Sequence, residues 1–245
     1  MIQVNELTKV FKTDEVETWA LDKVNIEIGQ GEFVAVMGPS GCGKSTILSM
    51  LAGQLAPSEG SIYIGGTIGY MLQKDYLLQW RSIRSNALLG LEIQKKLTPE
   101  NIAYVDTLLT QYGLGDFKNS LPNQLSGGMR QRAALIRTLA VRPDILLLDE
   151  PFSALDYQTR LSVSDEIGTI IREEGKTAIL VTHDISEAIS LSDRVVVLSK
   201  RPASLKKIFP IQFSTKNHTP MQAREAPEFK DYFNAIWKEL DVHVS

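Results

Sequence analysis

A glycine-rich segment early in the chain has the residue types and the spacing that phosphate binding requires. Residues 38–45 read Gly-Pro-Ser-Gly-Cys-Gly-Lys-Ser, fit the pattern G-x-x-x-x-G-K-[ST], and follow an apolar run at 33–37. Glycines let successive backbone N–H groups point into one concavity, and a helix that begins beside them adds the positive end of its dipole. We expect Lys44 to reach the β- and γ-phosphates and Ser45 to ligate Mg²⁺. The residues expected to contact the nucleotide are Gly38, Pro39, Ser40, Gly41, Cys42, Gly43, Lys44, Ser45 and Thr46.

Two adjacent acids follow a second apolar run. Asp149 and Glu150 come directly after residues 145–148, which read Ile-Leu-Leu-Leu. Acids at the end of a strand are usually only solvated, but a phosphate loop on a neighbouring strand favours a functional interpretation. We expect Asp149 to hold the hydration shell of Mg²⁺. Glu150 points in a different direction and is expected to polarise the attacking water as a general base. The loop and the acids together predict hydrolysis of a nucleoside triphosphate.

A second pair of glycines lies between the phosphate loop and the acids. Residues 125–132 read Leu-Ser-Gly-Gly-Met-Arg-Gln-Arg. Ser126 and the two glycine N–H groups open a helix, which makes another anion site at the positive end of a helix dipole. Within one chain this second site cannot also reach the loop at Gly38. Taken alone, the segment is also compatible with an ordinary helix cap.

The phosphate loop, this second segment and the acids occur in the order that is typical of ATP-binding-cassette (ABC) ATPases, which the chain resembles. Residues 125–132 resemble the LSGGQ signature of that family, with Met129 in place of glutamine. The resemblance implies an ATPase that uses ATP and Mg²⁺ and that forms an ATP-dependent, head-to-tail homodimer. In that dimer the signature of one subunit closes over the γ-phosphate held by the other. The residues implied to contact ATP from across the dimer are Leu125, Ser126, Gly127, Gly128 and Met129.

Further segments match the remaining motifs of the family. Gln73 resembles the Q-loop glutamine, which would touch Mg²⁺ or the attacking water and couple the site to a membrane partner. His183 resembles the switch histidine that contacts the γ-phosphate. Phe11 matches the aromatic residue that stacks on adenine, although a core position for Phe11 and stacking by Trp19 remain open alternatives. The loop implied to cross the dimer interface consists of Ser153, Ala154, Leu155 and Asp156.

Residues 73–80, 151–160 and 199–202 resemble the nitrate, sulfonate and taurine importer branch of the family, with Gln79 in place of a proline. The resemblance implies a peripheral subunit on the cytoplasmic face of the cell membrane, with an integral-membrane permease as partner and a substrate-binding protein as an indirect one. It also implies a substrate such as nitrate, a sulfonate or taurine, although selectivity lies in the partners. The residues matching the permease-docking segment of related importers are Tyr76, Leu77, Leu78 and Trp80.

The elements that must position these residues alternate between strands and helices. Apolar or alternating runs predict strands at 2–7, 24–28, 33–37, 61–64, 67–71, 145–148, 177–181 and 194–198, and helices are expected at 43–53, 157–174 and 185–190. Such alternation implies a parallel sheet covered on both faces. Residues 83–139 have a helical pattern and are expected to form an insertion.

The resemblance implies an α/β fold. It has a RecA-like P-loop NTPase core with a mixed sheet, an added antiparallel β-subdomain and an inserted α-helical subdomain at about 74–140. We expect the nucleotide-binding domain to span 1–200. A short C-terminal extension is expected at 201–245, with one amphipathic helix at 227–240.

Composition limits the classes of protein that remain. A net charge of −3 and a pI of about 5.7 give no basic footprint for nucleic acid. No apolar run approaches the roughly 18–20 residues that cross a bilayer, and the first residues lack the basic start and apolar stretch of a signal peptide. One cysteine, Cys42, excludes an internal disulfide and fits the reducing cytosol. Because Lys44 and a helix start both favour the thiolate, we expect Cys42 to be reactive.

The main alternative is an ABC ATPase that acts on DNA or on ribosomes instead of in transport. Chromosomal and repair members carry long heptad coiled coils between the phosphate loop and the signature, and no such repeat occurs here. Ribosome-associated members carry two cassettes, whereas one set of motifs is present. A non-hydrolytic regulatory module is a further alternative, which Glu150 and His183 disfavour.

Overall fold

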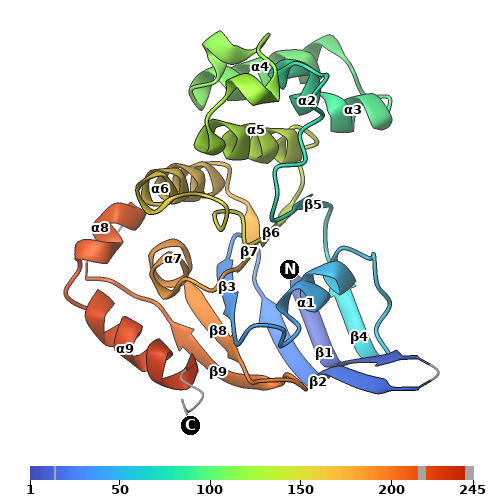
Figure 1. Cartoon of the computed structure of the whole chain (residues 1–245), viewed down its shortest axis with the longest axis vertical. Coiled ribbons are helices and arrows are strands. Elements are labelled where there is room, and N and C mark those ends of the chain that lie inside the picture. The colour runs from blue at the N-terminus through green and yellow to red at the C-terminus, as the bar shows by residue number, and fades with distance from the viewer. Residues whose placement is uncertain (14, 215–218, 241–245) are drawn as a thin grey trace.

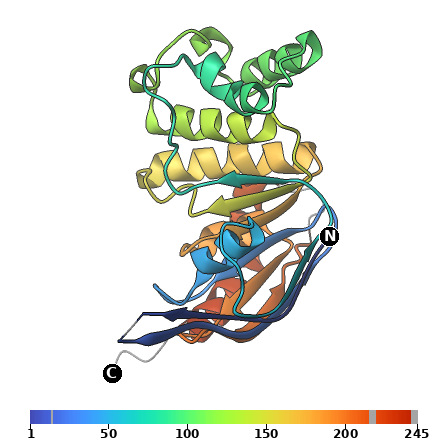
Figure 2. The same cartoon turned by 90° about the vertical axis from the view of Figure 1, so that its right-hand side faces the viewer.

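The computed structural model describes residues 1–13, 15–214 and 219–240 of the chain. In Figure 1 two sheets and their covering helices form the lower part, and a group of inserted helices lies above them. Figure 2 shows the same arrangement from the side, with the long N-terminal strands running along one flank. Among the described residues no helix is long and apolar enough to cross a membrane.

The central sheet is mixed and carries the predicted catalytic segments at the ends of its strands. Its order is β5 (Ile68–Met71), β6 (Ile145–Asp149), β7 (Thr177–Val181), β3 (Phe33–Met37), β8 (Arg194–Leu198) and β9 (Leu205–Pro210). Neighbouring strands run parallel, except that β9 is antiparallel to β8. Every residue of β3 and β7 is buried, as expected for parallel strands covered on both faces. The carboxyl ends of β6, β7 and β3 therefore meet at one edge of the sheet.

A smaller antiparallel sheet packs together with the helix that follows the phosphate loop. It consists of β2 (Glu17–Ile28), β1 (Ile2–Lys12) and β4 (Glu59–Ile64), and the helix is α1 (Lys44–Leu51). Residues at the end of β2 alternate between buried and exposed, which is the pattern of a sheet with one covered face. One apolar cluster joins this sheet, α1 and the central sheet through Leu21, Ile28, Val36, Ile47, Leu48 and Leu147. The start of α1 is thereby held by both sheets.

Helices cover the opposite face of the central sheet. Helix α6 (Tyr157–Glu173) shares a buried cluster with Leu146, Leu148 and Leu180 of the sheet. Helices α7 (Ile185–Leu191) and α9 (Phe229–Leu240) share another with Ala35, Met37, Val195 and Val197. The short helix α8 (Pro220–Glu225) contacts both α6 and α7 (Figure 1). Helices α8 and α9 therefore pack in the same body as the central sheet.

The inserted helices are α2 (Ile83–Ala87), α3 (Leu89–Ile93), α4 (Pro99–Gln111) and α5 (Gly127–Leu139), with short 3₁₀ turns at Gly115–Phe117 and Pro122–Gln124. Helix α4 begins where the sequence favours a start, because Pro99 occupies its first turn and the Thr98 side chain accepts the N–H of Asn101. Helix α5 packs on α6 in the largest apolar cluster, which includes Leu135 and Ile167. This contact fixes the orientation of the signature segment relative to the sheet.

The C-terminal extension differs from the prediction of one helix. Helix α9 matches the expected amphipathic segment, but the described residues also contain α8 and the edge strand β9. The six residues of α8 are too few to show a helical period, and their start is defined by Pro220 and a Thr219 cap instead. Strand β9 carries Lys206 and Lys207 on an exposed edge, so it lacks the apolar run by which strands were predicted. Because β9 pairs with β8, the extension continues the central sheet.

Candidate active site

The phosphate loop joins β3 to α1 and depends on glycine at two points. Gly41 and Gly43 have φ values of 71° and 119°, which other residues rarely adopt. A Cβ atom on Gly43 would also lie 2.9 Å from Leu21 Cδ2, and one on Gly38 would lie 2.9 Å from Cys42 Sγ. The loop therefore follows a path that side chains at these positions would disturb.

Lys44 lies under this loop and is only 7% exposed. Its Nζ donates hydrogen bonds to the carbonyl oxygens of Gly38 and Pro39 at 2.9 and 3.0 Å. A buried ammonium group needs such partners, because burying an unpaired charge is costly. The ammonium group is thus held at the mouth of the loop, where a phosphate oxygen could replace a carbonyl.

Strand order brings an acid to the start of α1. Ser45 Oγ donates to Asp149 Oδ1 at 3.0 Å, and Tyr70 donates its hydroxyl to Asp149 Oδ2 at 3.4 Å. Burial raises the pKa of Asp149, and the neighbouring charge of Glu150 raises it further. Burial, with the Asp149 charge, raises the pKa of Tyr70 to about 12. No sequence motif points to Tyr70, which the pairing of β5 with β6 places beside Asp149.

Glu150 stands in an unusual backbone conformation at the end of β6. Its φ is 45°, in the left-handed region, and its N–H donates to the Val181 carbonyl at 2.8 Å. His183 Nδ1 lies 3.3 Å from Glu150 Oε2, and Gln73 Nε2 lies 3.4 Å from the same oxygen. Gln73 also donates to Ser153 Oγ at 3.2 Å. Strained backbone of this kind clusters at functional sites, and here it turns the carboxylate toward the groups from β5 and β7.

These groups line one cavity of about 530 Å³. The residues around it are Gly38, Ser40, Gly41, Gly43, Lys44, Ser45, Gln73, Asp149, Glu150 and His183. The structure thus brings together residues separated by up to 145 positions in the chain, as the motifs predicted. Of the predicted phosphate segment, Cys42 is buried behind the loop, Thr46 lies half-buried in the first turn of α1, and Pro39 borders a neighbouring hollow.

The residues present fit a nucleotide carrying Mg²⁺. Ser45 and Asp149 offer oxygen ligands, which Mg²⁺ prefers. A hydrogen bond of 3.0 Å between Ser45 Oγ and Asp149 Oδ1 holds these two oxygens side by side. Among the described residues no group of three His, Cys, Asp or Glu side chains could hold a metal alone. Mg²⁺ is usually bound by one or two protein groups together with phosphates and waters, so two such ligands are enough.

The signature segment begins α5 and lies outside this cavity. Ser126 caps the helix, its Oγ accepting the N–H of Met129 at 3.3 Å. A Cβ atom on Gly128 would lie 2.6 Å from Val163 Cγ2, so glycine permits the close contact of α5 with α6. None of residues 125–129 lines the cavity around Lys44. The start of α5 therefore lies apart from the residues that surround Lys44.

The loop after Glu150 leads from the acid to α6. Ser153 Oγ donates to the Glu150 carbonyl at 3.0 Å, and Asp156 caps α6 by accepting the N–H of Thr159 at 3.1 Å. Ala154 is exposed and Leu155 is buried. The loop predicted to cross the dimer interface is therefore hydrogen-bonded directly to Glu150, the candidate general base.

Two expectations from the sequence are wrong. Cys42 is 1% exposed, and burial raises the pKa of its thiol more than the Lys44 charge lowers it, so the expected thiolate is disfavoured. Leu77 is 4% exposed and belongs to the apolar cluster of the inserted helices, so it is not available for docking. The other residues of that segment differ, because Tyr76 is 59% and Trp80 is 77% exposed, while Leu78 is half-buried.

The adenine-stacking candidates are neighbours on the antiparallel sheet. Phe11 is 41% exposed, Trp19 is 45% exposed, and Trp19 pairs with Val10 across the β1–β2 ladder. Lys9 Nζ lies 5.2 Å from the centre of the Phe11 ring. Both rings are available for stacking, so the two alternatives remain.

A family model described as ABC transporter matches residues 21–153, which include the phosphate loop, the signature and both acids. The chain therefore belongs to the ABC transporter family. It is an ATP-binding subunit of the ATPase type, with the P-loop NTPase fold of ABC cassettes. It resembles the uncharacterized ABC transporter ATP-binding protein YtlC of Bacillus subtilis, with 46% identity over 98% of this chain and 95% of that protein. The taurine import ATP-binding protein TauB of Roseobacter denitrificans is 36% identical over 96% of this chain and 94% of its own length.

Solved structures agree with this assignment. The dimeric, post-hydrolysis structure of the ATP-binding cassette MJ0796 bound to ADP and Pi is 33% identical, with a TM-score of 0.74. The match covers 86% of this chain and 99% of that one. A putative metal-chelate type ABC transporter in an inward-facing conformation is 25% identical with the same TM-score, over 85% of this chain and 82% of its own.

Proposed function

We propose that this chain is the ATP-hydrolysing subunit of an ABC importer and works as a head-to-tail homodimer beside a separate permease. The observation that carries the proposal is the single cavity that joins Lys44, Ser45, Asp149, Glu150 and His183. It combines a phosphate loop, oxygen ligands for Mg²⁺ and a carboxylate placed to accept a proton. These are the parts that phosphoryl transfer to water needs.

Each side chain has one task in this proposal. Lys44 and the loop N–H groups bind the β- and γ-phosphates, and Ser45 and Asp149 hold Mg²⁺, which neutralises charge on the phosphate oxygens. Gln73 is placed to contact Mg²⁺ or the attacking water. Glu150 orients the water and accepts its proton while the bond from the γ-phosphorus to the bridging oxygen breaks. His183, 3.3 Å from Glu150 Oε2, contacts the γ-phosphate and keeps that carboxylate in position.

The signature supplies the reason for a dimer. Helix α5 is 13 residues long, and the residues at its start do not line the chain's own cavity. In a head-to-tail dimer, Ser126 and the N–H groups of Gly127 and Gly128 of one subunit bind the γ-phosphate held by the other. The dimeric structures of MJ0796 support this arrangement. Closure of the dimer then requires bound ATP, and hydrolysis of that ATP allows the two subunits to separate.

The membrane partner and the substrate follow from the relatives and from one exposed surface. Tyr76 and Trp80 are exposed next to Gln73, and such aromatic residues are favoured at protein interfaces. We assign them to docking of the permease at the cytoplasmic face of the membrane. The taurine import relatives support an importer whose permease and substrate-binding protein select a small anion or organic solute such as nitrate, a sulfonate or taurine.

Replacing the proposed base tests this function. Glu150→Gln keeps the size of the side chain but cannot accept the proton, so hydrolysis should fall about 10²–10⁴-fold while MgATP still binds. The variant should also accumulate as an ATP-bound dimer, measured by light scattering with and without MgATP. Glu173→Gln, at an exposed position of α6, is the control. Near wild-type turnover of Glu150→Gln would remove Glu150 from the role of base.

A further inference from the structure

The segment that carries His183 connects β7 to α7, and hydrogen bonds hold the residues on both sides of the histidine. Thr182 Oγ1 accepts the N–H of Asp184 at 3.0 Å and donates to Glu187 Oε2 at 2.6 Å. Asp184 Oδ1 accepts the N–H groups of Ser186 and Glu187 at 2.7 and 3.2 Å and so caps α7. The His183 side chain itself is 58% exposed. The position of His183 therefore depends on where the neighbouring Asp184 is held.

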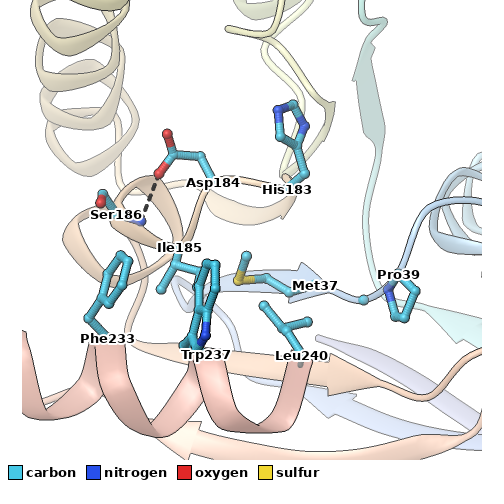
Figure 3. Close-up of a pocket in the computed structure, with 10 residues that line it drawn as sticks. Met37, Pro39, His183, Asp184, Ile185, Ser186, Phe233, Trp237 and Leu240 are labelled. Atoms are coloured by element: carbon cyan, nitrogen blue, oxygen red, sulfur yellow. Dashed lines mark hydrogen bonds between the residues drawn. The ribbon is translucent and has the colours of Figure 1, made fainter. Parts of the chain in front are cut away.

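The side chains of His183 and Asp184 project away from the C-terminal helix α9 (Figure 3). On the side of α9, Phe233 and Trp237 line a hollow of about 520 Å³ next to the phosphate loop. The two rings stack on each other with centroids 6.2 Å apart, so they pack within their own chain. A group that acts on the Asp184 carboxylate from its outer side must therefore come from another element.

Arg160, in the first turn of α6, is such a group. Its Nη2 donates to the Leu155 carbonyl at 3.0 Å, and its Nη1 lies 3.8 Å from Asp184 Oδ2. Leu155 belongs to residues 153–156, which are predicted to cross the dimer interface and which we call the dimer loop. One guanidinium group therefore contacts both the dimer loop and the residue that follows the switch histidine.

The contact between Arg160 and Asp184 is open in this structure. A charge-assisted hydrogen bond needs about 2.7–2.9 Å, so movement of about 1 Å would form one from the present 3.8 Å. Arg160 Nε is buried and has no hydrogen-bond partner among the described residues, so the guanidinium group is not yet fully satisfied. Arg224 of α8 also faces Asp184, but its Nη2 is held by Ser164 Oγ at 3.0 Å. Arg160 is thus the cation whose distance from Asp184 the dimer loop can change.

We propose that Arg160 is a positioning residue that couples the dimer loop to the switch histidine. When the partner subunit engages the dimer loop, the loop carries the guanidinium group toward Asp184, and the shortened contact fixes His183 against the γ-phosphate. This inference rests on the head-to-tail dimer of the proposed function and adds a connection within each subunit. A monomer that has bound ATP then lacks a fixed switch histidine, and hydrolysis waits for the partner.

The first test measures the steady-state kinetics of ATP hydrolysis. Arg160→Gln removes the cation, and Asp184→Asn removes the facing charge while keeping an oxygen that caps α7. Each should lower kcat about ten- to hundredfold, since misplacement by about 1 Å can have an effect of this size. The KM for MgATP should change by less than about twofold, because the contact acts on the reaction and not on nucleotide binding. The double variant should lose no more than either single one, because both changes break one contact.

Arg172→Gln is the matched control. Arg172 lies in the last turn of the same helix, donates Nη2 to the Leu191 carbonyl at 3.0 Å, and has Nη1 3.6 Å from Asp193 Oδ1. It makes the same kind of double contact without lining the ATP cavity. A merely structural role of Arg160 predicts that both variants lose stability and that neither changes kcat. Wild-type kcat in Arg160→Gln, an equal fall in Arg172→Gln, or additive losses in the double variant would overturn the proposal.

Hydrogen exchange read by mass spectrometry follows the coupling directly and does not depend on turnover. In the Glu150→Gln variant, MgATP should protect residues 125–129 through dimer formation and residues 182–187 through the shortened contact. Adding Arg160→Gln should remove most of the protection at 182–187 and leave that at 125–129. Equal protection of 182–187 with and without the Arg160 side chain would show that the inference is wrong. If 125–129 gains no protection in the Glu150→Gln parent, it is the proposed dimer that fails.

Discussion

A buried carboxyl group in helix α7, four residues after His183, predicts a measurable pH dependence of stability. Glu187 is 5% exposed in α7, and its Oε2 accepts the hydroxyl of Thr182 at 2.6 Å. Burial raises its pKa from the usual 4.5 to about 7, and the charge of Asp184 adds to the rise. Arg160 on α6 and Arg224 on α8 face the group and oppose the rise. The carboxyl group is therefore largely protonated in the folded protein where it would be ionised in the unfolded chain.

The size of the effect follows from this pKa. Because the folded-state pKa is raised, the contribution of Glu187 to stability is fully present below pH 4.5 and is lost as the pH rises through about 7. One pKa unit corresponds to about 1.4 kcal/mol, so the total loss is about 3 kcal/mol. Glu187→Gln cannot ionise and keeps an oxygen that accepts from Thr182. Relative to this variant, the wild type should lose about 2–3 kcal/mol of unfolding free energy between about pH 5 and about pH 8.

Urea unfolding at several pH values measures this difference. The wild type, Glu187→Gln and the exposed control Glu173→Gln are compared under the same salt conditions, and the unfolding free energies are plotted against pH. We expect the wild-type and Glu187→Gln curves to diverge with rising pH, while Glu173→Gln follows the wild type. Parallel wild-type and Glu187→Gln curves across this range would refute the argument, because they would show that Glu187 has the same pKa in both states.

Three further predictions concern Cys42 and Leu77, which are buried, and Trp80, which is exposed. Because Cys42 is buried and its thiol has a raised pKa, a maleimide should modify the folded protein at least about tenfold more slowly than the urea-unfolded chain. Mass spectrometry measures the rate of modification in both states. Equal rates would contradict the burial of Cys42. Leu77→Ala should cost about 2–5 kcal/mol of stability because Leu77 is core. Trp80→Ala should change stability by less than about 0.5 kcal/mol, yet reduce co-purification with the permease from solubilised membranes; an intact complex would remove Trp80 from docking.

The strands that the sequence predicted most accurately are those buried on both faces. Strands β3, β7 and β8 have the predicted bounds, since a continuous apolar run between polar residues leaves little choice of ends. Strands β1 and β2 extend about five and seven residues beyond the prediction, through positions such as Lys12 and Glu17. There the side chains are exposed, and the ladder between the strands maintains the extended backbone instead of apolar burial.

The site was predictable to the extent that motif order defines it. Ser45, Asp149, Glu150 and His183 do line one cavity, because each follows a strand of the same sheet. The sequence could not show that Leu77 turns inward while Trp80, three residues later, turns outward, since this segment has no regular period. It also could not show the hollow beside α9. That surface forms only when the end of the chain returns to the phosphate loop, a contact between residues about 200 positions apart.

The place of β3 within the central sheet has a consequence for synthesis of the chain on the ribosome. The phosphate loop is made early, but β3 pairs on one side with Thr177–Val181 and on the other with Arg194–Leu198. A nascent chain that ends before these segments leaves both edges of β3 without hydrogen-bond partners, and pairings so distant in sequence form slowly. We therefore expect ATP to find no formed site until residues 177–198 have been made, and bound ATP then to stabilise the folded site against unfolding. Ribosome-stalled chains cut short at about residue 170 should not bind nucleotide, whereas full-length chains should bind it upon release.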